Sequence, residues 1–516
     1  MKSRTENVKV NLIFNTIKFV TQLVLQFVLR TILIIVLGEE YLGINGLFSN
    51  ILSFLNLAEL GIGSAIVFSM YKPIADGDIE KIKSLQALYK KFYSIIFIVV
   101  LSLGLILLPF IKFFIKGEVT VDINIYVLYI MYLINTLIGY FSAHKRSLLF
   151  AYQRNDVENK VKTVCFFVMT IFQIVILIAF KNFYLYFMIN IIFTAIESII
   201  IHKYSIKLYP EINGIAQRLD KNTKTEISKN VFALSIHKIS SVIVFSTDNI
   251  LISALLGLTI LGAYSNYYLI ISTLTSVFIL LTNALTGSVG NLIASTDKQY
   301  AYEKFKLINF LFTIFSSFTT ICLVVLFQPF MSLWSDFASG GVTLLGFSSV
   351  ILLSISFYLN RMRTAVLMFI DGTGLYYKNR FVPVLEAVAN LSISILLGLI
   401  MGLNGVILGT IISTLIAPFW SGPQVLYKHY FKKSVWLYFK RYIIDTLTAI
   451  MVGIITYSVC AFIPDIGIWW LIVKFAVCGL LTLTLLLIAH CRTQEFKECV
   501  ALAKGFLSKR KNKIKD

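Results

Sequence analysis

The N-terminal region reads NLIFNTIKFVTQLVLQFVLRTILIIVL from Asn11 to Leu37, which is long and apolar enough to cross a bilayer as one helix. Polar side chains nevertheless recur along it at every third or fourth position: Asn11, Asn15, Lys18, Gln22, Gln26 and Arg30. At about 100° per residue they fall within one arc of about 120°. Because an arginine at mid-helix costs about 2.5–3.5 kcal/mol on insertion scales, this stripe is expected to face protein or water. Lys18, Gln22, Gln26 and Arg30 are therefore candidate binding residues.

A return helix over 41–71 carries Glu59 near its middle, within the run NLAELGIG. One interpretation is a buried Arg30–Glu59 pair that only locks two helices together. The other gives Glu59 a coupling or gating role, because the polar stripe on the first helix is longer than one ion pair needs. The sequence leaves both open.

The composition indicates a polytopic, all-α membrane protein. Of the 516 residues 58% are hydrophobic and 14% are charged, whereas soluble domains carry about 25% charged residues. Fourteen apolar runs have spanning length. They lie near 10–37, 41–71, 87–111, 122–143, 160–180, 183–204, 228–257, 259–290, 305–328, 342–370, 378–401, 403–427, 440–463 and 467–490.

The net charge of +20 is best explained by basic cytoplasmic loops rather than by nucleic-acid binding. With fourteen spans, 37 of the 46 Lys and Arg residues fall on the side that holds both termini, three on the other side and six within spans. Both ends are therefore predicted to be cytoplasmic. The sequence has no phosphate-binding GxxxxGK[ST] motif, no metal-ligand spacing and no disulfide framework, so no cofactor is expected.

An internal repeat organises the chain. The motif Leu37-Gly38-x-x-x-Leu42-Gly43 recurs as Leu256-Gly257-x-x-x-Leu261-Gly262, at an offset of 219 residues, and polar positions recur with it. Six spans separate the copies, so the two halves are expected to share one orientation and to be related by a pseudo-twofold axis along the membrane normal. The predicted parts are a first lobe, a cytoplasmic connector, a second lobe, two added helices and a basic tail, at 1–204, 205–227, 228–430, 431–490 and 491–516.

The second lobe also carries ionisable and polar residues inside its spans. Arg361 and Arg363 are candidate binding residues, as is Asn390, because arginine holds phosphate oxygens in a planar fork. His237, Asp248 and Glu386 are candidates for coupling or gating. Cations outnumber carboxylates, so a path between the lobes would be positive and would suit a large anionic group.

Several motifs resemble the polysaccharide repeat-unit flippases of bacteria, the Wzx type. They are LGEEYLGI at 37–44, NLAELGIGSA at 56–65 and RSLLFAYQRN at 146–155, which includes Arg146. The same superfamily holds the MATE drug exporters and the lipid II flippase MurJ. The resemblance implies alternating-access translocation of undecaprenyl-pyrophosphate-linked oligosaccharide across the bacterial cytoplasmic membrane, with membrane lipids, a glycan polymerase and glycosyltransferases as partners. Arg146 joins the candidate binding residues on this ground.

Alternatives remain at this point. A lipid II-type flippase, a MATE-type antiporter with an acidic or apolar cavity, and a membrane-embedded glycan polymerase are the rivals. The polymerase is disfavoured because the external loops are short, and the protein is expected not to be an enzyme. Na⁺ or H⁺ coupling is expected for want of a nucleotide motif, and Asp248 either senses that ion or closes a gate with Arg30.

Overall fold

The computed structural model describes residues 4–56, 62–152, 154–212, 246–339, 341–375 and 380–501, with residues 225, 378 and 504 besides. The side chains of residues 4–18, 62–65 and 155 are not part of that description. The chain forms two compact units, Met1–Ser265 and Asn266–Asp516. This boundary falls later than the connector predicted at 205–227.

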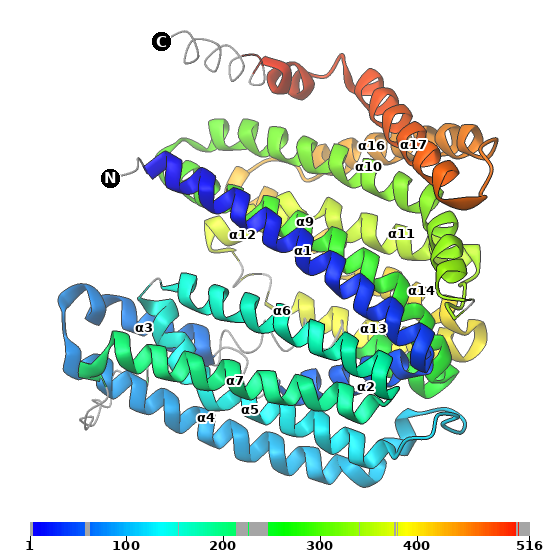
Figure 1. Ribbon diagram of the computed structural model, residues 1–516. Helices are drawn as coiled ribbons and strands as arrows, with labels where there is room; N and C mark the ends of the chain where they lie inside the picture. The colour runs from blue at the N-terminus through cyan, green and yellow to red at the C-terminus, as the bar shows by residue number, and fades with distance from the viewer. Residues whose placement is uncertain are drawn as a thin grey trace. The chain divides into compact units, whose positions relative to one another are not determined.

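The first unit is a helix bundle built around α5, which packs against α4, α3 and α7 (Figure 1). Side-chain caps begin several of its helices: Asp78, Asn124 and Asn182 each accept a hydrogen bond from a backbone N–H of the first turn. The helices are α1 (Arg4–Leu37), α2 (Glu40–Leu55), α3 (Ile62–Asp76), α4 (Ile79–Leu107), η2 (Leu108–Phe114), α5 (Ile125–Ala151), α6 (Asn155–Phe180), α7 (Phe183–Leu208) and η3 (Pro210–Ile212).

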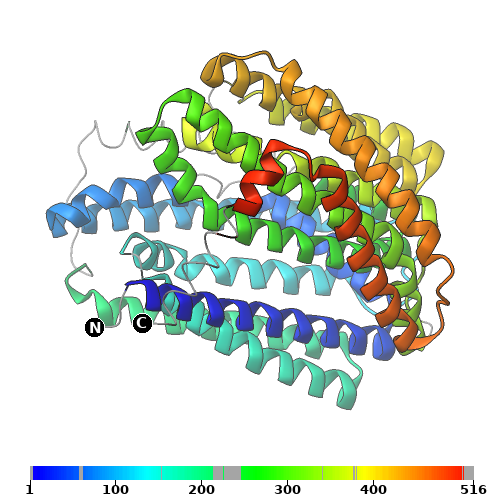
Figure 2. The same ribbon diagram turned by 90° about the horizontal axis from the view of Figure 1, so that it is seen from above.

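The second unit is centred on α10, which contacts α11, α12, α16 and α17. Figure 2 shows α17 and α16 running beside α10, where an apolar core joins the three helices. The elements from α9 onward are α9 (Leu258–Ser295), whose first turns belong to the first unit, α10 (Lys298–Phe337), α11 (Phe347–Met362), α12 (Thr364–Thr373), α13 (Val382–Met401), α14 (Leu403–Ile416), α15 (Pro418–Leu426), η5 (Tyr427–Phe431), α16 (Trp436–Cys460) and α17 (Gly467–His490).

Twelve helices among the described residues are long and apolar enough to cross a membrane. They coincide with twelve of the fourteen predicted spans, so the chain is a multi-pass membrane protein of helical fold. The other two predicted spans, 41–71 and 228–257, each include residues outside the described ranges, and the count of fourteen stays a prediction.

The predicted repeat is visible in the backbone. Gly38 and Gly257, which are equivalent under the repeat, both have positive φ, of 101° and 96°. Each of them ends one helical segment and allows the chain to turn into the next, a conformation that favours glycine. The shared left-handed turn supports the alignment of the two copies.

The two turns also pack on each other, within the first unit. A Cβ on Gly43 would lie 2.0 Å from the carbonyl oxygen of Leu258, and a Cβ on Gly262 would lie 2.4 Å from the carbonyl oxygen of Glu39. Glu39 and Leu258 are themselves equivalent, since each follows the turn glycine of its copy. The contact is therefore reciprocal, and only glycine fits on either side of it.

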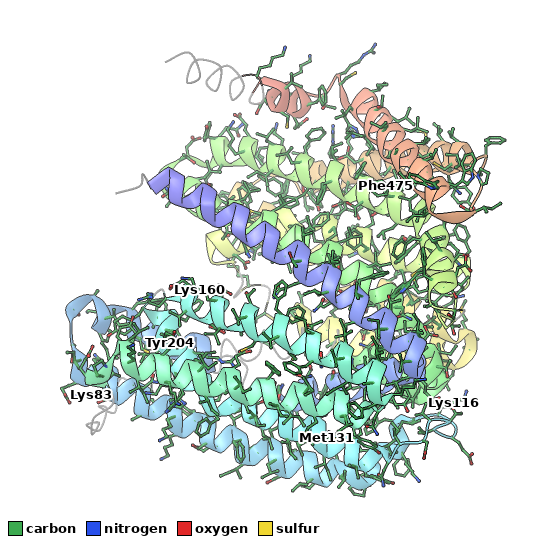
Figure 3. The ribbon with its side chains drawn as sticks, viewed as in Figure 1. Lys83, Lys116, Met131, Lys160, Tyr204 and Phe475 are labelled. Carbon is green, nitrogen blue, oxygen red and sulfur yellow. The ribbon has the colours of Figure 1, made fainter. Side chains whose placement is uncertain are left out.

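Basic side chains mark one end of the first unit. Figure 3 shows Lys83 and Lys160 at one end of the helices and Lys116 at the opposite end. This matches the predicted distribution, in which 72–91 and 144–162 lie on the basic side and Lys116 on the other.

We predict that Gly43→Ala and Gly262→Ala each destabilise the protein by about 1–3 kcal/mol, because the added methyl group meets backbone, which cannot rotate away. Gly46→Ala is the matched control, since its Cβ would lie 3.7 Å from the Leu261 side chain, an ordinary contact. Thermal unfolding of the detergent-purified protein measures the difference. Equal unfolding temperatures for all three variants would contradict the reciprocal contact.

Candidate functional site

Arg30 lies on α1 and is half-buried. Its Nη2 donates a hydrogen bond to the Ser265 hydroxyl, and Glu39 and Tyr186 lie close enough to interact with it electrostatically. Gln22 on the same stripe is half-buried, whereas Gln26 is exposed. The predicted polar face of α1 is thus in contact with protein at Arg30.

A second arginine of the first unit, Arg146, forms an ion pair that the sequence analysis missed. Its Nη2 lies 2.8 Å from Oε1 of Glu197 on α7, and its Nε donates to the Ser142 hydroxyl at 3.2 Å. The spans predicted at 122–143 and 160–180 leave Arg146 outside the membrane, but α5 continues to Ala151. Glu197 was overlooked although it is an isolated acidic residue in a long apolar run, which is the signal that marks intramembrane carboxylates.

Arg154, from the same sequence motif as Arg146, lies outside the spans and pairs instead with Asp156, with 2.9 Å between Nε and Oδ1. The hydrogen bond to Asp156 raises the pKa of Arg154 above its usual value. This pair is exposed at the start of α6, so it contributes little to stability.

Arg361, at the end of α11, lies against aromatic rings. Its guanidinium carbon is 5.8 Å from the ring centroid of Phe278 on α9 and 5.9 Å from that of Phe357, distances at which a cation is attracted to the ring face. Its Nε is buried and has no hydrogen-bond partner among the described residues. No carboxylate of the described chain forms an ion pair with Arg361, so it retains donor capacity that a ligand could use.

Arg363 is more completely paired than Arg361. Its Nη1 lies 3.9 Å from Oε1 of Glu386 on α13, and that carboxylate also accepts a hydrogen bond from Thr414 at 3.4 Å. Both charged side chains are largely buried, with 14% and 15% exposed. Arg363, a candidate for binding, and Glu386, a candidate for coupling or gating, therefore contact each other.

Asn390 lies in the packed interface between α13 and α14. It is fully buried between α13 and α14, and its Nδ2 donates to the Thr410 hydroxyl at 2.9 Å. The helices approach closely there because Gly405 and Gly409 carry no side chain. In this structure Asn390 therefore joins two helices, and its role in substrate binding stays a prediction.

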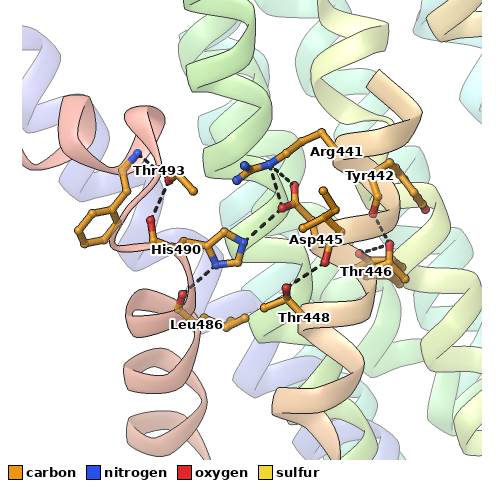
Figure 4. Close-up of polar contacts among 11 residues, drawn as sticks. Arg441, Tyr442, Asp445, Thr446, Thr448, Leu486, His490 and Thr493 are labelled. Atoms are coloured by element: carbon orange, nitrogen blue, oxygen red, sulfur yellow. Dashed lines mark hydrogen bonds and ion pairs between the residues drawn. The ribbon is translucent and has the colours of Figure 1, made fainter. Parts of the chain in front are cut away.

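The added helices α16 and α17 carry a buried ionic cluster that the sequence analysis did not identify (Figure 4). Asp445 is 2% exposed; Arg441 Nε lies 2.9 Å from its Oδ1, and His490 Nε2 lies 3.3 Å from the same atom. The other ring nitrogen of His490 is 2.9 Å from the Leu486 carbonyl. The cluster holds α16 against α17 through paired, hydrogen-bonded groups.

An apolar groove of about 390 Å³ lies between α9, α10 and α17 of the second unit. Phe475 of α17, labelled in Figure 3, lines it together with Phe315, Phe318 and Gly479. An adjoining apolar pocket of about 520 Å³ shares Phe315 and Phe318 and reaches Phe496 and Val500 after α17. The two together form one apolar surface along α10 and α17.

The remaining candidates are placed only in part. The backbone of Lys18 lies in α1, but its side chain, like all of Glu59 and His237, lies outside the described residues. Asp248 is half-buried in the helical segment 246–256. The role of Asp248 in coupling or gating stays a prediction.

Comparisons with known proteins place the fold. No family model and no curated protein sequence matches the chain. Among solved structures it is similar to the lipid II flippase MurJ in an inward closed conformation, with a TM-score of 0.65 and 14% identity over 93% of this chain and 99% of the other.

The chain is also similar to MATE transporters. An inward-facing multidrug resistance MATE transporter of the MOP superfamily gives a TM-score of 0.60 at 14% identity, over 78% of this chain and 94% of the other. A Vibrio cholerae MATE transporter gives 0.51 at 14% identity, over 81% and 95%. The chain therefore has the helical membrane fold found in MATE and MurJ transporters of the MOP superfamily.

Proposed function

We propose that this protein is a flippase that moves undecaprenyl-pyrophosphate-linked oligosaccharide repeat units from the inner to the outer leaflet of the bacterial cytoplasmic membrane by alternating access. Its product would serve the synthesis of capsule, exopolysaccharide or O-antigen-type polymers. The sequence motifs at 37–44 and 146–155 resemble those of Wzx flippases, and the fold likeness to MurJ covers nearly the whole chain.

One observation carries the proposal: a cation with spare donors lies next to an apolar groove. The Phe278 ring contacts both Arg361 and Phe315, and 4.5 Å separates the Phe278 and Phe315 ring centroids. Phe315 in turn lines the groove between α9, α10 and α17. Two aromatic rings, Phe278 and Phe315, thus connect Arg361 to the groove. This arrangement suits a substrate in which a pyrophosphate is joined to a long hydrocarbon chain.

The chemistry of the groove fits the lipid part of such a substrate. Among the described residues that line the groove, only Thr319 and Cys322 have a side chain with a hydroxyl or thiol, and the others are apolar. Burying hydrocarbon in it is favourable by about 0.8 kcal/mol for each CH₂ group removed from water, although a tail already in lipid gains less. The groove would therefore guide the tail rather than supply the affinity.

A MATE-type exporter of cationic drugs is less compatible with the charges. Three membrane-embedded carboxylates, those of Glu197, Glu386 and Asp445, each lie beside an arginine, so their charge is already compensated. Arg361, by contrast, would repel a cationic substrate from its surroundings. A Na⁺ or H⁺ gradient remains the expected energy source, with Asp248 as the candidate coupling residue.

We predict that Arg361→Gln lowers export of surface polysaccharide about 10-fold or more, because a charge-assisted hydrogen bond to phosphate contributes about 1.5–3 kcal/mol. The measurement is complementation of a strain that lacks its own flippase, with protein in the membrane quantified. Lys160→Gln is the control, since that exposed side chain lies at the start of α6. Wild-type export by Arg361→Gln would refute the assignment.

We also predict that Gly479→Phe reduces flipping by about 10-fold, because a ring at that position fills the groove; a Cβ there meets only the tip of Phe318, at 4.0 Å. Leu480→Phe is the matched control, since Leu480 is the next residue on α17 and its side chain is 69% exposed. Proteoliposomes containing fluorescent undecaprenyl-pyrophosphate oligosaccharide measure the rate. Equal rates for the two variants would show that the tail does not use the groove.

A further inference from the structure

A small polar pocket lies inside the first unit, at the meeting of α2, α5 and α7. Its volume is about 210 Å³. It is lined by Asn45, Ser49, Leu52, Ser53, Asn56, Tyr132, Asn135, Thr136, Phe187 and Asn190.

Helical periodicity explains how these side chains meet. Asn45, Ser49 and the adjacent pair Leu52 and Ser53 recur along α2 about one turn apart, and Asn56, the C-cap of α2, follows Ser53 by three residues, so they share one face. Tyr132, Asn135 and Thr136 form the corresponding face of α5, and Phe187 and Asn190 that of α7. Since α5 and α7 are among the apolar helices long enough to span a membrane, the pocket brings four amides to membrane depth.

The polar groups of the pocket exceed what helix packing needs. Tyr132 donates its hydroxyl to Asn45 Oδ1 at 2.6 Å, and Tyr140 donates to Asn56 Oδ1, which are interhelical bonds of an ordinary kind. Asn135 differs, because its Oδ1 is buried and no described residue donates to it. An unsatisfied buried acceptor costs about 1–3 kcal/mol, and a ligand hydroxyl that donates to Asn135 would remove that cost.

The lining excludes several ligand classes. None of the described residues that line it is charged, so they offer neither cations for phosphate nor carboxylates for a metal ion. Amides and hydroxyls outnumber its apolar residues, which disfavours a lipid tail. What fits is a neutral molecule with many groups that both donate and accept hydrogen bonds.

Aromatic rings complete the pocket. Tyr132 and Phe187 are stacked with 3.8 Å between their centroids and 21° between their planes, and Phe48 contacts Tyr132 edge-on at 5.5 Å. Rings fixed in this way offer an apolar surface for the C–H groups of a sugar, while the amides bind its hydroxyls. The volume is below the about 300–1,000 Å³ typical of drug-sized ligands, so it suits a single sugar ring.

We propose that this pocket binds one neutral sugar residue of the oligosaccharide carried on the lipid. The inference rests on the proposed flippase function and adds to it a specificity site in the first unit. Ser49 and Ser53 on α2 are exposed and mark the side from which the sugar enters. Asn135 on α5 and Asn190 on α7 bind the hydroxyls of the sugar.

The test compares binding of undecaprenyl pyrophosphate alone with binding of the same lipid carrying glucose, galactose or N-acetylglucosamine. We expect at least one sugar to tighten binding to the detergent-purified protein about 10-fold, as two hydrogen bonds of about 0.5–1.5 kcal/mol each would do. Asn135→Ala and Asn190→Ala should abolish this gain and leave the affinity for the bare lipid unchanged. Asn50→Ala should keep the gain, because Asn50 lies on α2, is not among the residues that line the pocket, and donates to the Gly46 carbonyl.

The outcomes separate the two proposals. If the bare lipid binds and Arg361→Gln weakens it, but no sugar tightens binding or the gain survives in both asparagine variants, the sugar pocket is refuted and the flippase proposal stands. If none of the four lipids binds the wild-type protein, the flippase proposal fails and the sugar pocket fails with it. Matching unfolding temperatures for Asn135→Ala and Asn50→Ala confirm that folding is not the cause of any difference.

Discussion

The close approach of two glycine-bounded turns is the contact on which the first unit depends. Gly43 meets the backbone of Leu258 and Gly262 meets the backbone of Glu39, so each copy of the repeated motif supplies both a glycine and the residue against which the other glycine packs. In a membrane the hydrophobic effect does not drive helices together, and close backbone packing takes its place. The reciprocal contact also fixes α1, whose Arg30 reaches Ser265 one turn beyond Gly262.

Charge compensation is the second constraint, because an unpaired charge at membrane depth is costly. Three arginines are compensated by an ion pair with a carboxylate: Arg146 with Glu197, Arg363 with Glu386 and Arg441 with Asp445. Arg361 meets it differently, through the rings of Phe278 and Phe357, which lower the cost of burial without using its hydrogen-bond donors. That difference makes Arg361 the arginine most suited to an anionic ligand.

Each unit carries a surface that matches one part of the proposed amphipathic substrate. Hydrocarbon is matched by the groove along α10 and α17, and the anionic group by Arg361, both in the second unit. The amide-lined pocket of the first unit matches a neutral sugar. The three parts of the substrate need surfaces of different chemistry, since a surface that favours hydrocarbon penalises unpaired amides and charges.

Local sequence determined the helices, the repeat and the basic end of the first unit, because hydropathy, glycine spacing and loop charge are read within one or two turns of chain. It also identified Arg30, Arg361 and Arg363 as unusual, since charge within an apolar run is a local property, and it marked Arg146 through a motif resemblance. Which partner each one has was decided only by tertiary structure. Glu197, the burial of Asn390 and the pocket around Asn135 depend on which faces of separate helices meet, and helical period fixes a residue's face without fixing the helix that packs against it.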